Sequence, residues 1–159
     1  GFIFKESEKP RRINGSYVKR IGVPHFFMEK LRLGEDYVDN KGKRYENSLL
    51  TYEPKKSHTY AFCSDNRIKA DFFKKLEGVT VLYHESTFLH KELKKAKKTF
   101  HSTAKETALL AKDVNPDLLI LGHYSARYTS VNPLLEEAEQ IFKQTNAAEA
   151  KNVFDFSKI

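Results

Sequence analysis

Short apolar runs alternate with helical patterns from Ser57 onward. The apolar runs are too short for a core helix and are flanked by polar residues, so each of them predicts a buried strand. We expect these strands at Thr59–Ser64, Val79–Tyr83 and Leu118–Leu121. The helical spacing of apolar positions predicts one helix over Ala104–Val114 and another around the stripe from Leu134 to Phe142. Strands that alternate with helices are typical of an α/β (α+β) layer fold.

Two further signals refine this α/β region. Thr103 stands just before the first of the two helices, and Glu106 follows at the spacing of a capping box. Near the carboxyl end, Val153–Phe156 predicts a last strand. We therefore expect the helix to begin after Thr103 and the last strand to lie at Val153–Phe156.

The amino-terminal third of the chain has a different character. Gly1 to Glu8 predicts a strand, and because the chain opens directly on it, the start is expected to be internal to a longer protein. Pro10 to Lys56 is charged and rich in turn residues, which indicates a peripheral segment. Within this segment we expect a helix at Phe26–Leu31 and a hairpin over Tyr37–Tyr45. The predicted division is a peripheral segment, 1–56, and an α/β region, 57–159.

Composition and charge narrow the function classes. Of the 159 residues 40% are hydrophobic, and the chain has neither an apolar run long enough to span a membrane nor an apolar signal core, so we expect a cytoplasmic protein. The single cysteine, Cys63, cannot form an internal disulfide, and its apolar neighbours indicate burial. The net charge of +7 attracts polyanions, although such an excess most often belongs to a solvated face. The densest basic patch is Lys91, Lys94, Lys95, Lys97 and Lys98.

Groups that bind metals or move protons stand where each predicted strand ends. Asp65 follows the first strand and His123 follows the third, while His84 and Glu85 come after the second. Loops gather at strand ends in open α/β folds, so this recurrence favours a common site. His101 joins the set just before a helix, where the helix dipole can tune its imidazole. Each residue taken singly has a simpler explanation as a turn, cap or hydrogen-bonding residue, but together they offer the nitrogen and oxygen donors that zinc prefers.

Four short motifs carry a resemblance to a known family. In chain order they are Cys63-Ser64-Asp65-Asn66-Arg67, His84-Glu85-Ser86-Thr87-Phe88, His101-Ser102-Thr103-Ala104 and Gly122-His123-Tyr124-Ser125-Ala126-Arg127-Tyr128. In order and spacing this set resembles ribonuclease Z, with looser similarity over the whole chain. The resemblance implies the C-terminal half of a metallo-β-lactamase αββα sandwich. It also implies a zinc-dependent endoribonuclease that removes 3′ trailers from precursor tRNA by phosphodiester hydrolysis.

The resemblance implies roles for individual residues as well. Asp65 is expected to bridge two zinc ions, and His123 is expected to ligate one of them. His101 is expected to assist proton transfer to the leaving ribose oxygen while Glu85 orients it, which is a chemically sensible pairing. The phosphate anchors implied by the resemblance are Ser125 and Arg127. The complete enzyme is expected to bind precursor tRNA as a homodimer, with no membrane partner.

The sequence also departs from the family pattern. The His-x-His-x-Asp-His motif, which supplies most zinc ligands in the family, is absent from these 159 residues. Asp65 and His123 alone cannot hold two zinc ions, so we predict that this chain by itself has little or no nuclease activity. The stretch 22–27 lies where the family tends to carry a Gly-Pro motif in a tRNA-binding arm, and here the second Gly-Pro is missing. The arm function of segment 1–56 therefore stays open.

Two alternatives to this function remain. Another hydrolase of the metallo-β-lactamase fold would lack the His101-Ser102-Thr103 and Ser125-Ala126-Arg127 elements, which are both present. A non-catalytic RNA-binding module would not need histidines and carboxylates aligned at loop positions, although a truncated chain would behave as one. The endoribonuclease interpretation accounts for more of the residues.

Overall fold

The computed structural model describes residues 1–69 and 71–158, which form two compact units. Unit 1 consists of Gly1–Lys5 and His58–Ile159, and unit 2 consists of Glu6–Ser57. Phe2–Lys5, which the sequence-based division places in segment 1–56, pair with a strand of unit 1. This pairing is long-range, so local patterns along the chain do not reveal it.

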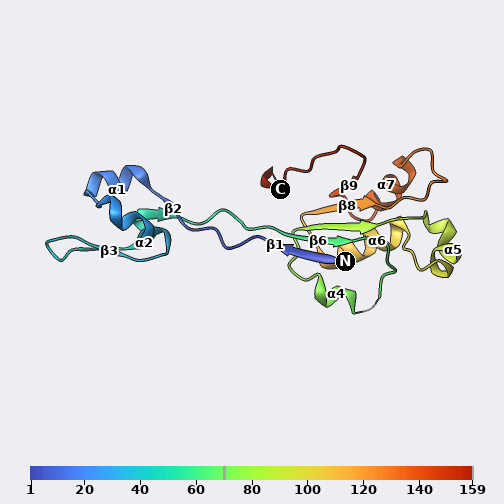
Figure 1. Ribbon diagram of the computed structural model, residues 1–159, viewed down its shortest axis with the longest axis horizontal. Helices are drawn as coiled ribbons and strands as arrows, with labels where there is room; N and C mark the ends of the chain where they lie inside the picture. Colours follow the sequence, from blue (N-terminus) through green and yellow to red (C-terminus); the bar gives the residue numbers. More distant parts are fainter. Residues whose placement is uncertain (70, 159) are drawn as a thin grey trace. The chain divides into compact units, whose positions relative to one another are not determined.

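Unit 1 is built on a five-stranded mixed sheet (Figure 1). Its strands are β1 (Phe2–Lys5), β6 (Thr59–Cys63), β7 (Val81–Glu85), β8 (Leu118–Gly122) and β9 (Thr145–Ala147). The spatial order is β1-β6-β7-β8-β9, with β1 antiparallel to β6 and the remaining neighbours parallel. Because parallel strands end at the same edge of a sheet, the residues that follow β6, β7 and β8 lie close together.

The three strands predicted in the α/β region are confirmed with shifted ends. The predicted Val79–Tyr83 strand begins at Val81 and extends through Glu85. The predicted Leu118–Leu121 strand extends by one residue to Gly122, and all five of its residues are buried. Burial on both faces explains the unbroken apolar run, which is typical of a parallel strand in the middle of a sheet.

The expected last strand at Val153–Phe156 is wrong. The last strand is β9, which pairs in parallel with Leu119–Leu121. Val153 is 90% exposed, while Phe154 and Phe156 pack their rings on the face of the sheet, and a short helix η3 (Phe156–Lys158) ends the described chain. An apolar stretch can cover a sheet as well as join it, and its pattern does not distinguish the two.

The described part of unit 1 has five helices besides the short η3. They are α4 (Phe72–Lys75), η2 (His90–Glu92), α5 (Leu93–Lys98), α6 (Ala104–Val114) and α7 (Asn132–Glu139). The main core lies between the sheet and residues of α4, α6 and α7. Leu82 and Leu119 of the sheet are fully buried against Ala108 of α6, and burying a leucine side chain contributes about 1.5–3 kcal/mol. α6 spans the predicted residues, and the predicted capping box of Thr103 and Glu106 is present. Among the described residues no helix is long and apolar enough to cross a membrane.

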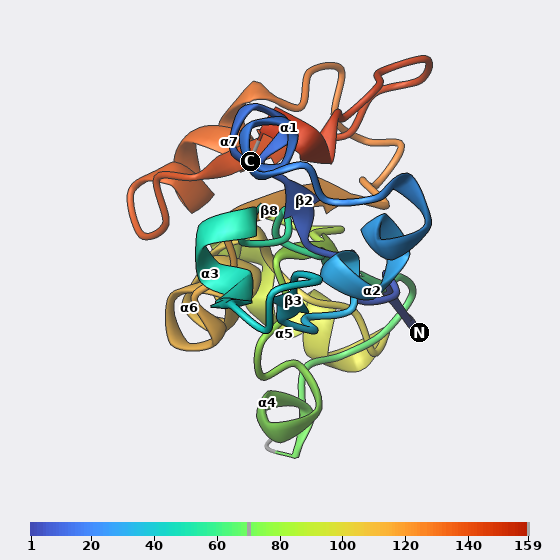
Figure 2. The same cartoon turned by 90° about the vertical axis from the view of Figure 1, so that its left-hand side faces the viewer.

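Unit 2 has a small core of its own. Its elements are β2 (Arg12–Ile13), α1 (Gly15–Ile21), η1 (His25–Phe27), α2 (Met28–Arg32), β3 (Tyr37–Val38), β4 (Arg44–Tyr45), α3 (Asn47–Leu50) and β5 (Thr51–Tyr52). The helix expected near Phe26–Leu31 is confirmed as η1 followed by α2, and the expected hairpin is confirmed as β3 paired with β4. The short helices seen in Figure 2 bring Val18, Leu31 and Leu50 together in this core.

Candidate active site

Four of the predicted site residues meet at the edge of the sheet where the parallel strands end. They are Asp65 after β6, Glu85 at the end of β7, His101 just before α6, and His123 after β8. One ligand atom from each lies within 4.8 Å of the others. We call this group the acid–histidine cluster. Parallel strand order explains the convergence, because it places residues from three loops beside one another.

Glu85 is the buried anchor of the cluster, with none of its surface exposed. Its two carboxylate oxygens accept four hydrogen bonds. The donors are the backbone N–H of Asn66 and Ser102, the hydroxyl of Thr87 and Nδ1 of His101. A buried carboxylate without such partners would be strongly destabilising. Because every side of the carboxylate is occupied by a donor, Glu85 is suited to orient a neighbour rather than to ligate a metal.

His101 is oriented by Glu85. Its Nδ1 lies 3.1 Å from Glu85 Oε1 and 3.6 Å from Asp65 Oδ1, and its side chain is 21% exposed. A carboxylate can only accept, so Nδ1 donates and carries the proton. The other ring nitrogen, Nε2, is therefore the one left to exchange a proton with a bound molecule.

His123 is held in a complementary way. Its Nδ1 lies 3.0 Å from the hydroxyl of Thr87, which itself donates to Glu85. Thr87 has one hydroxyl proton, so while it donates to the carboxylate it accepts from Nδ1–H of His123. With Nδ1 occupied in this way, Nε2 is the ring nitrogen that can bind a metal ion.

Two of the cluster residues adopt a left-handed backbone conformation. Asp65 has φ of 51° and His123 has φ of 57°. Asp and His tolerate this conformation better than most side chains, and it is uncommon outside glycine. His123 directly follows β8 and Asp65 lies two residues after the end of β6, so the sharp turn keeps each side chain at the sheet edge instead of carrying it away with the loop.

The predicted phosphate anchors lie on the loop after β8. Ser125 is tied to the cluster because its backbone N–H donates to the carbonyl of Thr87 at 3.1 Å. Arg127 donates from Nε to Ser125 Oγ at 3.1 Å and forms an ion pair with Glu92. A hydrogen bond from Tyr128, together with the charge of Arg127, holds the pKa of Glu92 below its ordinary value. Arg127 is therefore fixed beside the cluster rather than free in solvent.

Sequence reasoning assigned no role to Thr87 and Glu92. Thr87 links His123 to Glu85. Its position in the second motif, directly after Ser86, could have indicated a role in the site. Glu92 is the one acidic residue in the lysine-rich stretch 91–98, and this was its signal in the sequence. Its partner Arg127 becomes known only from the structure. Both contacts span 35 or more positions along the chain, so a local pattern does not show them.

His84, the neighbour of Glu85, points away from the cluster. Side chains alternate along a strand, so adjacent residues of β7 face opposite sides of the sheet. His84 is completely buried, donates from Nδ1 to the carbonyl of Glu85 at 2.7 Å, and meets the ring of Phe72 edge-on. Burial lowers the pKa of His84, which favours the neutral imidazole. Its role is packing.

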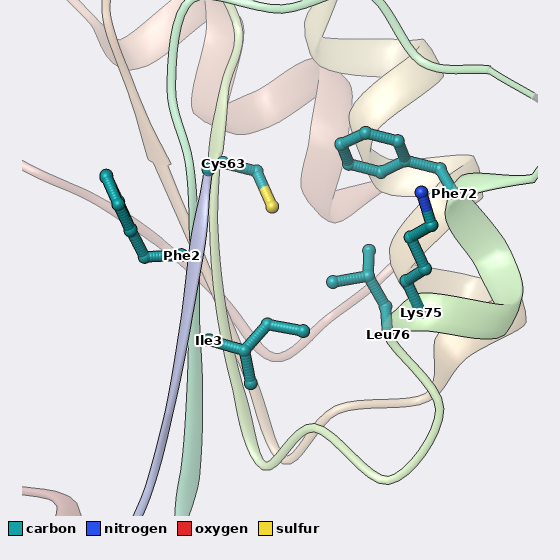
Figure 3. Close-up of a pocket in the computed structure, with 7 residues that line it drawn as sticks. Phe2, Ile3, Cys63, Phe72, Lys75 and Leu76 are labelled. Atoms are coloured by element: carbon teal, nitrogen blue, oxygen red, sulfur yellow. The ribbon is translucent and has the colours of Figure 1, made fainter.

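A cavity of about 220 Å³ lies elsewhere in unit 1, beside β1 and α4 (Figure 3). The side chains that Figure 3 shows around it are mostly apolar, and the sulfur of Cys63 points into it. Burial raises the pKa of the Cys63 thiol, which disfavours the nucleophilic thiolate. With a mostly apolar lining and a disfavoured thiolate, this cavity is a weaker candidate for a catalytic site than the acid–histidine cluster.

The fold has a counterpart among solved structures, while no family model matches the chain. The metallo-β-lactamase fold protein YhfI of Bacillus subtilis superposes with a TM-score of 0.54 over 58% of this chain and 38% of that chain, at 22% sequence identity. Similarity at this level shows the fold. The protein is therefore a mixed α/β protein of the metallo-β-lactamase fold class.

Sequence comparison identifies the relatives. Ribonuclease Z of Bacteroides fragilis is 37% identical over 145 residues, which are 91% of this chain and 48% of that protein. Ribonuclease Z of Porphyromonas gingivalis is 37% identical over 155 residues, which are 98% of this chain and 51% of that protein. The chain is thus a homologue of ribonuclease Z over most of its length. It spans about half the length of the relatives that it matches.

Proposed function

We propose that this chain supplies one wall of the active site of a zinc-dependent endoribonuclease of the ribonuclease Z type. The substrate is precursor tRNA, and the reaction is hydrolysis of the phosphodiester that joins the 3′ trailer to the tRNA. The observation that supports this proposal is the acid–histidine cluster, found at the sheet edge of a ribonuclease Z homologue. Another hydrolase of this fold would lack the His101-Ser102-Thr103 and Ser125-Ala126-Arg127 elements, and a non-catalytic RNA-binding module would not need the cluster.

The donor set suits zinc. Asp65 offers a carboxylate that is 74% exposed, and His123 offers a free Nε2, because Thr87 occupies its Nδ1. Zinc takes such oxygen and nitrogen ligands, usually four in tetrahedral geometry, so two from this chain would form part of a site. When bound, zinc supplies Lewis-acid chemistry and makes water more acidic. Asp65, with its exposed carboxylate, would be the bridging ligand of a two-ion site.

His101 is the proposed proton donor. Its Nδ1 is held by Glu85, so its Nε2 can deliver a proton to the departing ribose oxygen. The products would be a 3′ hydroxyl on the tRNA and a 5′ phosphate on the trailer. Glu85 positions the imidazole without touching the substrate.

Ser125 and Arg127 are the proposed phosphate anchors. The planar guanidinium of Arg127 can hold a phosphate through two parallel hydrogen bonds and stays charged at any physiological pH. Its Nε already donates to Ser125 and one terminal nitrogen faces Glu92, so its orientation is set before substrate arrives. Pre-set orientation reduces the entropy lost on binding.

A chimera tests the proposal. These 159 residues would replace the matching region of the Bacteroides fragilis ribonuclease Z, and cleavage of a precursor tRNA would be followed with zinc and with a chelator. We expect zinc-dependent cleavage at the 3′ end of the tRNA sequence. A folded, zinc-loaded chimera that leaves precursor tRNA intact, or cuts it elsewhere, would contradict the proposal.

The isolated chain provides a second test, because it lacks the His-x-His-x-Asp-His motif. We predict little or no cleavage by the chain alone, and robust zinc-dependent cutting would refute this. Cytoplasmic location, homodimerisation and an RNA-binding role for unit 2 are further expectations from the resemblance. Salt titration of tRNA binding with and without chelator separates phosphate contacts from metal contacts, since phosphate-driven binding weakens steeply with salt.

A further inference from the structure

Phe100 adopts a backbone conformation that favours glycine. Its φ is 62°, in the left-handed region. Helix α5 ends at Lys98, and the backbone N–H of His101 donates to the carbonyl of Ala96 at 2.9 Å. This bond closes the type of helix terminus in which the residue at the position of Phe100 is usually glycine. A bulky side chain there costs free energy, so local stability does not explain why phenylalanine occupies the position.

The ring of Phe100 does not pack into the core, so burial does not offset the cost of the left-handed conformation. It is 71% exposed. The ring lies at the rim of a cavity of about 410 Å³ that is also lined by Asp65 of the acid–histidine cluster, and Phe100 directly precedes His101. An exposed aromatic ring held in a strained conformation beside candidate catalytic groups points to a ligand that the ring contacts.

The charges around the cavity indicate the kind of ligand. Arg67 and Lys69 are exposed on the same rim. A third cation, Lys75, is paired at 3.6 Å with Asp71, so these two lining residues offset each other. Exposed cations beside an exposed aromatic ring form the combination that binds single-stranded nucleic acid, in which bases stack on the ring and phosphates meet the cations.

We propose that Phe100 is a stacking platform for an unpaired RNA base next to the acid–histidine cluster, with Arg67 and Lys69 contacting the adjoining phosphates. This rests on the proposed function, because RNA is the ligand class, and it adds a subsite beyond the metal and phosphate residues. The fixed backbone at the end of α5 holds the ring in one place, so the base stacks without first ordering a flexible loop.

Substitution by glycine separates this role from a structural one. F100G relieves the left-handed strain, so its thermal stability should equal or exceed that of the wild type. At the same time its affinity for a short single-stranded RNA carrying 2-aminopurine should fall roughly ten-fold, and stacking-induced quenching of the probe should disappear. F100W should retain both the affinity and the quenching, whereas F100L, which lacks a π face, should lose the quenching. F2L is the matched control, because Phe2 is 68% exposed in the same unit.

The binding is measured with a chelator present, so it does not depend on zinc or on cleavage. Failure of the chimera to cut precursor tRNA would count against the proposed function. The RNA-binding measurement would still test the stacking proposal, because it does not require cleavage. The stacking proposal is overturned if the wild-type chain does not quench the probe, if F100G binds as tightly as the wild type, or if F2L weakens binding as much as F100G.

Discussion

Arg127 and Glu92 form an ion pair that links the loop after β8 to the start of α5. The guanidinium of Arg127 also lies 5.1 Å above the ring of Phe88, and Glu92 accepts a second hydrogen bond from the hydroxyl of Tyr128. The lowered pKa of Glu92 keeps it ionised at neutral pH, so the pair persists there. We infer that Glu92 is a positioning residue that orients Arg127 toward phosphate.

Substitutions of Glu92 test this positioning role. In the chimera, E92A should raise KM for precursor tRNA roughly ten-fold with a smaller change in kcat, because a mobile Arg127 must be ordered on binding. E92Q keeps the hydrogen-bonding shape and should recover part of the loss. K94A, on the exposed lysine-rich stretch nearby, is the control. Tighter tRNA binding by E92A would instead mean that Glu92 competes with phosphate.

Gly122 leaves room for the hydroxyl of Tyr83. A Cβ added at Gly122 would lie 2.1 Å from that oxygen, and the Tyr83 ring is stacked on Phe62 at 4.7 Å. The Tyr83 hydroxyl is also hydrogen-bonded by the backbone of His123, so moving it disturbs a cluster residue. The glycine is thus required for space rather than for a special backbone angle.

We expect G122A to lower the free energy of unfolding by about 1–3 kcal/mol, the usual cost of overpacking a core. The zinc affinity of the chimera should fall as well when it carries G122A, because His123 follows directly. Urea denaturation and zinc titration measure the two effects. G15A is the control, since a Cβ at Gly15 meets nothing within 4 Å. A G122A chain as stable as G15A would show that Tyr83 is free to move.

Much of the fold could be predicted because its signals are local. The helix Ala104–Val114 and its capping box lie within a few positions of each other, and so do the strands of the hairpin over Tyr37–Tyr45. The pairing of Phe2–Lys5 with β6 and the packing of Phe156 on the sheet are long-range. Whether an apolar segment pairs or only packs depends on partners that its own sequence does not contain.

The candidate site could be predicted in part for the same reason. Strand ends converge in a parallel sheet, so Asp65 and His123 could be expected together before any coordinates were known. Thr87 and Glu92 contact His123 and Arg127, which lie far along the chain, so the local sequence around Thr87 and Glu92 does not reveal these partners. The strain at Phe100 is visible only as a backbone angle. The roles of the site residues remain predictions that the substitutions test.

His84 predicts how stability depends on pH. Burial lowers its folded-state pKa, so the unfolded chain binds a proton more readily than the folded chain. Its contribution is therefore fully present above the unfolded pKa of about 6.5 and is lost as pH falls below that value. Acidification from about pH 7.5 to about pH 5.5 should therefore lower the free energy of unfolding of the wild type.

The comparison that isolates His84 is urea denaturation of the wild type and of H84Q at both pH values. The H84Q chain should be less stable overall but should lose less on acidification. H25Q is the control, because His25 is exposed in unit 2. If H84Q and the wild type lose equal stability on acidification, His84 is not the group responsible.

In the acid–histidine cluster, Asp65 and His123 are proposed to bind zinc, whereas His101 is proposed to donate a proton. The most direct test of these separate roles measures both the cleavage rate and the zinc content of the chimera carrying H101A. The account predicts that H101A retains the zinc content of the parent while its single-turnover cleavage rate falls by about 10²–10⁴-fold, the usual contribution of a general acid. A loss of zinc with H101A, or an unchanged rate, would contradict it.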